Sequence, residues 1–219
     1  GVYLLPTSTL PLGFVLFQLS AFAFLALHYA RTLREGRQQR ETLRRMTQML
    51  RRDPVTGLFT KVHLQELLDG LPKTAAGGLL FIDLDNFKAI NDRYGHLCGD
   101  AVIKTLATAL RDQLRSEDLP CRWGGDEFLV YLPGASIDDV SKLAERLRVA
   151  VSATAFEGAR GLAPSMSMGY APLRNDGWHS ALTRADAALY TSKRRGRDQL
   201  TIDGQEAEEQ SGIVADGAY

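Results

Sequence analysis

Two short acidic motifs are the strongest candidates for chemistry in this chain. Asp83 and Asp85 lie two residues apart at the end of an apolar run, so on a strand their side chains would share one face. Asp126 and Glu127 follow two glycines, which let the backbone approach a ligand closely. Mg²⁺ prefers oxygen ligands and usually takes one or two protein carboxylates together with substrate phosphates. If the two motifs meet in space, they predict a site for metal-assisted phosphoryl transfer.

Each acidic motif also has a purely structural explanation. Asp85 is the first residue of a predicted short helix, where an aspartate commonly caps the N-terminus. A turn rich in Gly, Asp and Glu is often only a turn. The residues by themselves therefore predict a Mg²⁺–phosphate site and leave the reaction open.

The hydrophobic pattern predicts the elements that must position these acids. A continuous apolar run after Gly77 predicts a buried strand ending at the first motif, and two apolar runs around residues 124–127 predict a β-hairpin. Apolar residues at helical spacing predict helices at 62–71, 85–94, 99–114, 137–154 and 179–195, with a further strand at 164–171. This order predicts an α/β (α+β) domain with a mixed, mostly antiparallel sheet flanked by helices and preceded by a long N-terminal helix.

The N-terminal segment has a different character from the rest of the chain. Residues 1–30 contain no Asp, Glu, Lys or Arg, and residues 10–29 are long enough to cross about 30 Å of hydrocarbon as a helix. A signal peptide would carry its basic residues before the apolar run, whereas here they follow it, and a buried core helix is rarely free of charge on every face. We expect a transmembrane helix at 1–30, as the last span of a larger sensor, with its C-terminal side in the cytoplasm.

A basic segment follows the apolar one. Residues 31–52 contain eight Arg and two Glu, and Leu33, Leu43, Met46 and Leu50 are spaced as one helical stripe. The segment is expected to be either a signalling helix that pairs two protomers or a linker lying on anionic lipid head groups.

The charge of the remaining chain excludes one class of partner. The whole chain has 26 basic and 26 acidic residues, so the part after residue 52 is acidic, which argues against broad nucleic-acid binding. Cys98 and Cys121 lack metal-ligand spacing and are expected to be reduced thiols. Residues 204–219 have no periodicity and are expected to form a disordered tail.

The run Arg-Trp-Gly-Gly-Asp-Glu-Phe at 122–128 resembles the GGDEF family of diguanylate cyclases. The resemblance extends through residues 53–58, 81–100, 167–171 and 185–200, in the family's order and spacing. It implies a palm-like domain over residues 53–203, similar to class III nucleotide cyclases. It also implies that two GTP molecules condense into cyclic di-GMP and two pyrophosphates with Mg²⁺, or alternatively Mn²⁺, as cofactor.

The resemblance assigns catalytic roles to matching positions. Asp83 and the main-chain carbonyl of Leu84 correspond to metal ligands, as do Asp126 and Glu127. Asp126 also corresponds to the residue that activates the attacking 3′-hydroxyl, and Lys88 to a lysine that stabilises the transition state.

The resemblance also implies a substrate site and an inhibitory site. Residues matching the substrate-binding positions are Asn91, His96, Asp100, Gly124, Gly125, Lys193 and Arg197. Lys193 and Arg197, four residues apart near a predicted helix end, would share one side and clamp the triphosphate, although the run Lys-Arg-Arg-Gly-Arg alone would suggest a solvated basic face. Arg115 and Asp118 match the RxxD site at which the product inhibits the enzyme, where an ordinary ion pair is the alternative.

The resemblance further implies a homodimer, because each product molecule needs two facing half-sites. Together with the expected transmembrane helix, it predicts the inner (cytoplasmic) membrane of a bacterium as location, with the catalytic domain in the cytoplasm. Two alternatives remain: a catalytically inactive module that binds GTP or cyclic di-GMP, and a cyclase with a different product. Residues 59–61 (Phe-Thr-Lys) depart from the family pattern, and Pro120 is an unusual neighbour of the hairpin that is expected to stiffen its entry.

Overall fold

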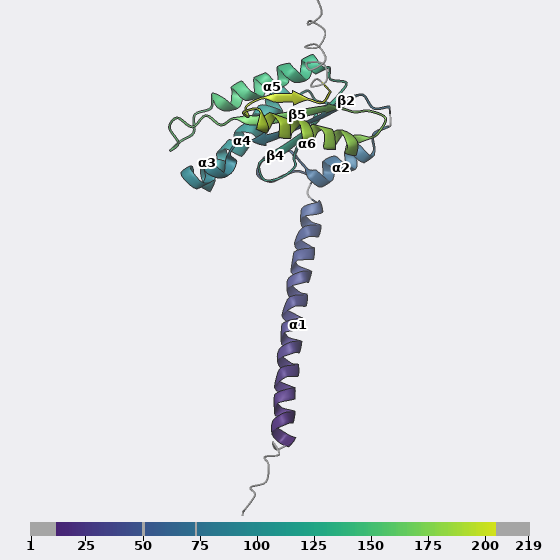
Figure 1. Cartoon of the computed structure of the whole chain (residues 1–219), viewed down its shortest axis with the longest axis vertical. Helices are drawn as coiled ribbons and strands as arrows, with labels where there is room; N and C mark the ends of the chain where they lie inside the picture. The colour runs from purple at the N-terminus through teal and green to yellow at the C-terminus, as the bar shows by residue number, and fades with distance from the viewer. Residues whose placement is uncertain (1–11, 50, 73, 205–219) are drawn as a thin grey trace, which may run out of the picture. The chain divides into compact units, whose positions relative to one another are not determined.

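The N-terminal unit of the chain consists of one long helix. The computed structural model describes residues 12–49, 51–72 and 74–204, with side chains of the first helix described from Gly13 to Arg34. The chain divides into two compact units, Gly1–Met49 and Leu50–Tyr219 (Figure 1). In the first, α1 (Leu12–Met49) joins the predicted apolar and basic segments in one 38-residue helix.

The apolar part of α1 has the length and composition of a membrane span. The segment Gly13–Arg34 has a mean hydropathy of 1.6, and none of its most apolar window is buried. Phe22 and Phe24 are 74% and 71% exposed. An exposed apolar helix is therefore present where it was predicted. The side chains at 43, 46 and 50, and the predicted tail after residue 204, lie outside the described residues.

A mixed sheet forms the centre of the second unit. Within the described residues it has six strands in the order β1-β3-β4-β2-β5-β6. The strands are β1 (Phe59–Thr60), β2 (Gly77–Leu84), β3 (Leu119–Arg122), β4 (Glu127–Pro133), β5 (Met166–Pro172) and β6 (Leu200–Ile202). The inner pairs are antiparallel, whereas the edge pairs β1–β3 and β5–β6 are parallel. The predicted mixed, mostly antiparallel sheet is confirmed, although the two shortest strands were not predicted.

Five helices accompany this sheet in the described part of the second unit. They are α2 (Lys61–Asp69), α3 (Phe87–Tyr94), α4 (His96–Gln113), α5 (Ile137–Ser152) and α6 (Trp178–Arg194). The prediction that one helix begins at Gly99 is wrong by three residues. Gly95, with φ 84°, ends α3 and leads directly into α4, and this backbone conformation favours glycine.

The prediction that Asp85 caps the short helix is also wrong. The residue before α3 is Asn86, which has a left-handed backbone (φ 52°) and makes no side-chain capping bond. Asp85 is 5% exposed, and its carboxylate accepts hydrogen bonds from residues far along the chain. β2 ends at Leu84, so the two aspartates of the first motif have different surroundings.

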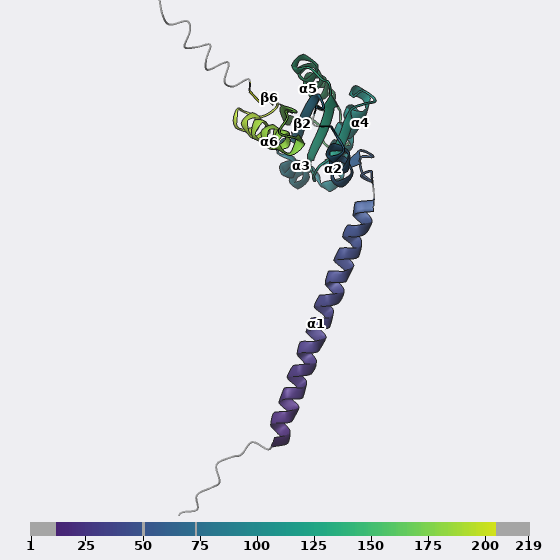
Figure 2. The same cartoon turned by 90° about the vertical axis from the view of Figure 1, so that its right-hand side faces the viewer.

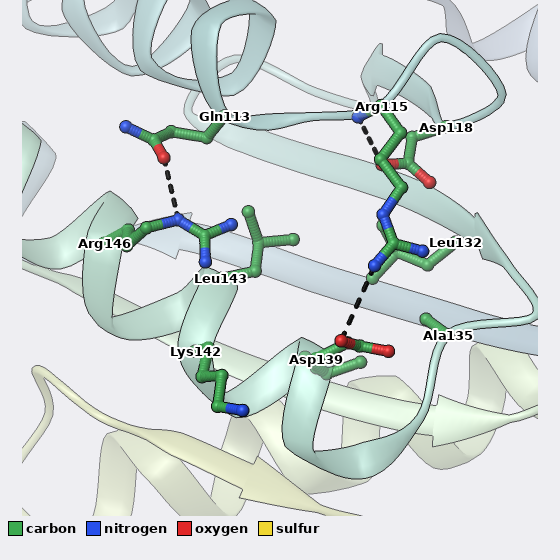
Figure 3. Close-up of a pocket in the computed structure, with 10 residues that line it drawn as sticks. Gln113, Arg115, Asp118, Leu132, Ala135, Asp139, Lys142, Leu143 and Arg146 are labelled. Carbon is green, nitrogen blue, oxygen red and sulfur yellow. Dashed lines mark hydrogen bonds and ion pairs between the residues drawn. The ribbon is translucent and has the colours of Figure 1, made fainter.

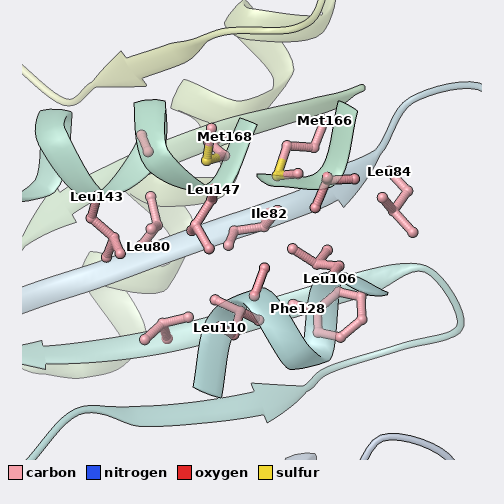
Figure 4. Close-up of a cluster of buried hydrophobic side chains, with 14 of the residues drawn as sticks. Leu80, Ile82, Leu84, Leu106, Leu110, Phe128, Leu143, Leu147, Met166 and Met168 are labelled. Carbon is pink, nitrogen blue, oxygen red and sulfur yellow. The ribbon is translucent and has the colours of Figure 1, made fainter. Parts of the chain in front are cut away.

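The period-two alternation of the strands divides the core between the two sheet faces. On one face, Leu80, Ile82 and Phe128 pack against α4 and α5 (Figure 4). On the other, Leu79 and Phe81 pack against α2 and α6. Figure 2 shows α4 and α6 on opposite sides of the sheet. Because Asp83 follows Leu79 and Phe81 at spacing two, its side chain lies on the α6 face.

A glycine lets α6 approach β5 very closely. A Cβ atom at Gly169 would lie 2.1 Å from the Ala185 carbonyl oxygen and 2.2 Å from the Leu189 nitrogen, which no side chain can tolerate. Near the end of α6, the buried Ser192 hydroxyl donates to the Met168 carbonyl at 2.7 Å. These contacts determine where the last turn of α6 lies relative to the sheet.

The two cysteines are free, as predicted. Cys121 lies in β3, where burial raises the pKa of its thiol to about 12. Pro120 stands in the same strand opposite Val130, one residue before the pairing with β1 begins.

Candidate active site

Strand register brings the two acidic motifs together. In the antiparallel pairing of β2 with β4, Asp83 is directly opposite Glu127. Opposed residues point to the same sheet face with Cβ atoms about 4.5–5.5 Å apart. The Leu84 N–H donates to the Asp126 carbonyl at 3.3 Å, so the turn residue also lies beside the end of β2.

The turn between β3 and β4 is held by its own backbone. The N–H groups of Trp123 and Gly124 both donate to the Glu127 carbonyl, at 2.9 and 3.1 Å. A Cβ atom at Gly124 would lie 2.6 Å from Glu127 Oε2, whereas one at Gly125 would meet nothing within 4 Å. The first glycine makes room for the glutamate, and the second leaves open space at the tip of the turn.

Arg122 links this turn to the start of the domain. Its guanidinium donates to the Gly125 carbonyl (2.8 Å from Nη2) and forms an ion pair with Asp53 at 3.3 Å. Asp53 also accepts from the Thr56 N–H and hydroxyl, at 2.8 and 2.7 Å. The loop 53–58, which was noted in the sequence only as part of the family pattern, therefore supports the acidic turn.

The departure from the family pattern at Lys61 supports the same turn. The Lys61 ammonium lies 4.3 Å from the centre of the Trp123 ring, within the range of a cation–π contact. Trp123 also packs edge-to-face on Phe81 of β2.

Asp83 and Glu127 lie among other acidic side chains, and the lysine closest to Asp83 is Lys193. Asp83 is 8% exposed, and its Oδ2 lies 2.8 Å from Lys193 Nζ of α6. Burial raises the pKa of Asp83, Lys193 opposes this, and the negative charges of Asp126 and Asp85 add to it. The pKa of Glu127 is raised by burial and then by Asp83 and Asp126. The folded protein therefore disfavours the charged form of both acids.

This donor set suits a divalent cation. Carboxylates that repel one another are stabilised in their charged form by a nearby positive charge. Mg²⁺ usually takes one or two protein carboxylates and completes its shell with water and phosphates, and Asp83 and Glu127 supply two on one sheet face. Among the described residues, no group of three His, Cys, Asp or Glu side chains gathers closely enough to form a metal site of its own.

Four of the residues predicted to contact the nucleotide or its transition state lie on α3 and α4, the two helices that follow β2 in the chain. Lys88 is exposed on α3, and His96 and Asp100 are exposed on the first turns of α4. Asn91 of α3 is half-buried, and its side chain lies against Gly99 of α4. A Cβ atom at Gly99 would lie only 2.0 Å from Asn91 Oδ1. The glycine of the Gly-Asp pair at 99–100 thus makes room for the asparagine.

The prediction that Lys193 and Arg197 share one side of a helix is wrong. α6 ends at Arg194, and Arg197 lies in the following loop with φ 65°. Gly196, with φ 112°, interrupts the helix in a conformation that favours glycine. Lys193 contacts Asp83 from α6, whereas Arg197 lies in the loop between α6 and β6.

The predicted inhibitory residues line a separate pocket (Figure 3). Asp118 accepts from the Arg115 main-chain N–H at 2.8 Å, while the Arg115 guanidinium extends to Asp139 at 3.5 Å. Arg115 and Asp118 therefore do not form the simple side-chain ion pair that was the alternative interpretation. Both side chains face the pocket.

Two cations of this pocket were missed by sequence reasoning. Lys142 and Arg146 of α5 line it, and Arg146 Nε donates to Gln113 Oε1 at 2.8 Å. Their spacing of four places them on one helix side, but only the fold turns that side toward Arg115. The pocket thus gathers three cationic side chains.

The chain is similar to known proteins in sequence and in fold. The family model described as "Diguanylate cyclase, GGDEF domain" matches residues 50–199. Diguanylate cyclase DgcP of Pseudomonas aeruginosa is 41% identical over 157 residues, which cover 68% of this chain and 23% of that protein. Response regulator PleD of Caulobacter vibrioides is 38% identical over 158 residues, covering 68% of this chain and 35% of PleD. The chain thus matches about a quarter to a third of the length of these relatives.

A solved structure supports the same assignment. The GGDEF domain of DgcB from Caulobacter crescentus, in complex with c-di-GMP, superposes with a TM-score of 0.65 at 30% identity. The match covers 70% of this chain and 95% of that domain. On the family match, the related sequences and the shared fold, this chain belongs to the GGDEF family of diguanylate cyclase domains.

Proposed function

We propose that this chain condenses two molecules of GTP into cyclic di-GMP and releases two pyrophosphates. The observation that carries the proposal is the pairing of Asp83 with Glu127 across β2 and β4, with Lys193 at 2.8 Å from Asp83. Acids at one sheet end beside a lysine suit a magnesium-bound triphosphate.

The acids are proposed to hold the metal and activate the nucleophile. Asp83, the Leu84 carbonyl, Asp126 and Glu127 would hold Mg²⁺ or Mn²⁺, which when bound makes the 3′-hydroxyl more acidic and stabilises charge on the α-phosphate. The Asp126 carboxylate accepts the hydroxyl proton as the new oxygen–phosphorus bond forms and pyrophosphate leaves. Lys88 stabilises the negative charge of the transition state.

Different residues are proposed to bind the guanine base and the triphosphate. Asn91 and Asp100, with His96 beside them, would pair with the guanine edge, whose N1–H and N2–H groups a carboxylate accepts well. Adenine would leave that carboxylate unpaired, which costs orders of magnitude in discrimination. Lys193 and Arg197 would neutralise the triphosphate, and the open space at Gly125 leaves room for the nucleotide.

The reaction requires two domains. The two phosphodiester bonds are made head to tail, so two nucleotide-loaded domains must face each other, and holding them together contributes through proximity. We propose that the segment 31–52 pairs two protomers in a homodimer. The exposed apolar segment Gly13–Arg34 supports a location in the inner membrane of a bacterium, with the catalytic domain in the cytoplasm.

The pocket around Arg115 and Asp118 is proposed to bind the product as an inhibitor. Arginine grips phosphate bidentately and stacks on guanine, and Arg146 and Lys142 add positive charge to the same pocket. The product would thus be bound away from the acids.

The test is an Asp126→Asn variant beside the wild type, with products identified by mass spectrometry after incubation with GTP and Mg²⁺, and with ATP as competitor. The wild type is expected to form cyclic di-GMP, and the variant to lose at least about 100-fold in rate with an unchanged circular-dichroism spectrum. Asp138→Asn, an exposed acid in the first turn of α5, is the control and should retain activity. Tight GTP binding without turnover would indicate a regulatory module, and another product would indicate a different cyclase.

A further inference from the structure

Asp85 is a buried acid, and both oxygens of its carboxylate accept hydrogen bonds. Oδ1 accepts from the Ser167 hydroxyl at 2.6 Å, and Oδ2 accepts from the Ser165 hydroxyl at 2.7 Å and from the Asp198 N–H at 3.1 Å. The residue is 5% exposed. Three donors already bind this carboxylate, so it links the start of β5 and the loop after α6 to the end of β2.

The loop after α6 has an uncommon backbone. Arg197 and Asp198 have φ values of 65° and 48°, in the left-handed region that non-glycine residues seldom adopt. Such a residue is strained and persists only where its surroundings hold it in place. The Arg197 N–H donates to the Ser192 carbonyl at 3.0 Å, and the Asp198 N–H donates to Asp85.

A second element holds the same loop through a side chain. Arg148 of α5 binds both oxygens of the Asp198 carboxylate, at 2.9 Å from Nε and 2.7 Å from Nη2. A bidentate guanidinium–carboxylate pair restrains direction as well as distance. Asp198 is thus held at its main chain by Asp85 and at its side chain by Arg148.

We propose that Asp85 and Arg148 are positioning residues that hold Arg197 and Asp198, in the loop 195–198, in their left-handed conformation and thereby set the place of Arg197 beside the triphosphate. The inference rests on the proposed function, because it assumes that Arg197 binds the triphosphate. Asp85 lies two residues after Asp83, so its bond to Asp198 ties the loop directly to the strand end that carries the acid.

A control for Arg148 lies at the other end of β6. Asp198 precedes β6 and is bound by Arg148, whereas Asp203 follows β6 and is contacted by Arg174 Nη2 at 2.9 Å and by Arg184 Nε at 3.0 Å. Arg148→Gln removes the guanidinium that binds Asp198, and Arg174→Gln removes one of the two that contact Asp203. Only the first of these aspartates is adjacent to Arg197.

The primary measurement is the affinity of the full chain for a non-hydrolysable GTP analogue with Mg²⁺, by isothermal titration calorimetry, beside the KM and kcat for GTP. Arg148→Gln is expected to weaken analogue binding and raise KM by roughly fivefold to tenfold with a smaller change in kcat. Arg174→Gln should stay within about twofold of the wild type. Arg148→Lys should recover only part of the loss, because an ammonium cannot bind both oxygens.

A double-mutant cycle distinguishes positioning from general destabilisation. In an Arg197→Ala background, Arg148→Gln should cause no further loss of analogue binding, because the residue it positions is already gone. Additive losses, or equal losses from Arg148→Gln and Arg174→Gln, would overturn the proposal. So would analogue binding by Arg148→Gln that equals the wild type.

Asp85→Asn provides an independent readout at the other support. It should speed amide hydrogen exchange across residues 195–200, and unchanged exchange there would contradict the role of Asp85. Because removal of a buried acceptor can unfold the domain, the Arg148 variants decide the matter if this variant does not fold. If the wild type neither binds the analogue nor turns over GTP, the proposed function itself fails. If it does both and Arg148→Gln behaves identically, the positioning role alone is wrong.

Discussion

At the scale of residues, the folded protein disfavours the charged form of two acids in the candidate site. Burial raises the pKa of both Asp83 and Glu127, and neighbouring acids raise them further. Lys193 lies 2.8 Å from Asp83 and partly offsets this effect. A metal-bound nucleotide would therefore have to share Lys193 with Asp83, which couples binding of the triphosphate to binding of the cation.

Asp53 is expected to make stability depend on pH. Burial alone would raise the pKa of Asp53, but hydrogen bonds from Thr56 and the charge of Arg122 leave it below its usual value. A lowered pKa in the folded state means a stabilising contribution that is present at neutral pH and lost as pH falls through that folded value. Asp53→Asn should therefore lower the free energy of unfolding by about 1 kcal/mol at pH 7, with a smaller difference in acid. Urea denaturation at several pH values measures this, and a difference independent of pH would contradict it.

Gly169 is expected to tolerate no side chain. Gly169→Ala would force a Cβ atom into the backbone of α6, so the helix must shift and carry Lys193 away from Asp83. We expect a loss of roughly 1–3 kcal/mol in the free energy of unfolding and a marked loss of activity.

The control for Gly169 is Gly70→Ala. Gly70 has φ −79°, and a Cβ atom there would meet its nearest neighbour at an ordinary 3.5 Å. This variant should leave thermal unfolding and activity nearly unchanged. Equal effects of the two substitutions would show that contact between α6 and β5 is not what limits Gly169.

At the scale of elements, three ends converge on the candidate site. β2 ends at Leu84, the β3–β4 turn lies opposite it, and α6 ends at Arg194. Antiparallel pairing of β2 with both β4 and β5 makes this possible, because the end of β2 meets the beginning of each neighbour. The site thus depends on register, and a slip of one residue would turn Asp83 and Glu127 to opposite faces.

The start of α5 is expected to modulate product inhibition. Asp139 forms a capping box with Ser136 and also pairs with Arg115 at 3.5 Å. In the proposed inhibitory site its carboxylate would compete with a phosphate for Arg115, so Asp139→Asn should strengthen inhibition by cyclic di-GMP about twofold to fivefold. Initial rates at increasing product concentration measure the effect, with Arg115→Ala as the opposite control that weakens inhibition. Weaker inhibition in Asp139→Asn would mean that the carboxylate helps to bind the product.

At the scale of the whole molecule, one of the two units is a single helix and the other is a folded domain. The second unit, Leu50–Tyr219, contains the whole sheet and both hydrophobic clusters. It also contains every residue proposed for catalysis. The first unit supplies the exposed apolar helix and the basic segment, whose proposed roles are attachment and pairing.

A chain lacking residues 1–49 is expected to fold but to depend strongly on its own concentration. Its thermal unfolding should remain cooperative, since the core lies within residues 50–204. Its rate per molecule should rise over about a hundredfold range of protein concentration, because the proposed reaction needs two domains to meet. The full chain in lipid nanodiscs should depend less on concentration. A rate per molecule that is constant for the shortened chain would contradict the need for two domains.

The secondary-structure elements and the chemical types of the site residues could be predicted from the amino-acid sequence. The apolar run after Gly77 became β2, the glycine-rich turn became a hairpin, and the predicted helices are present with shifts of a few residues at their ends. These features depend on local hydrophobic spacing and on glycine, which act over one or two turns of chain. The edge strands β1 and β6 have only two and three residues, too few for any periodicity to predict them.

Which side chains contact one another could not be predicted, because it depends on the folded arrangement of distant segments. Asp85 looked like a helix cap because its neighbours in sequence suggested one, yet its partners lie 80, 82 and 113 residues away. Arg197 lies outside the helix, because Gly196 has a backbone conformation that ends it and Asp85 binds the Asp198 main chain; the local helical pattern predicts neither. Pairings of this kind follow from strand register and from packing between distant segments, which short-range spacing does not encode.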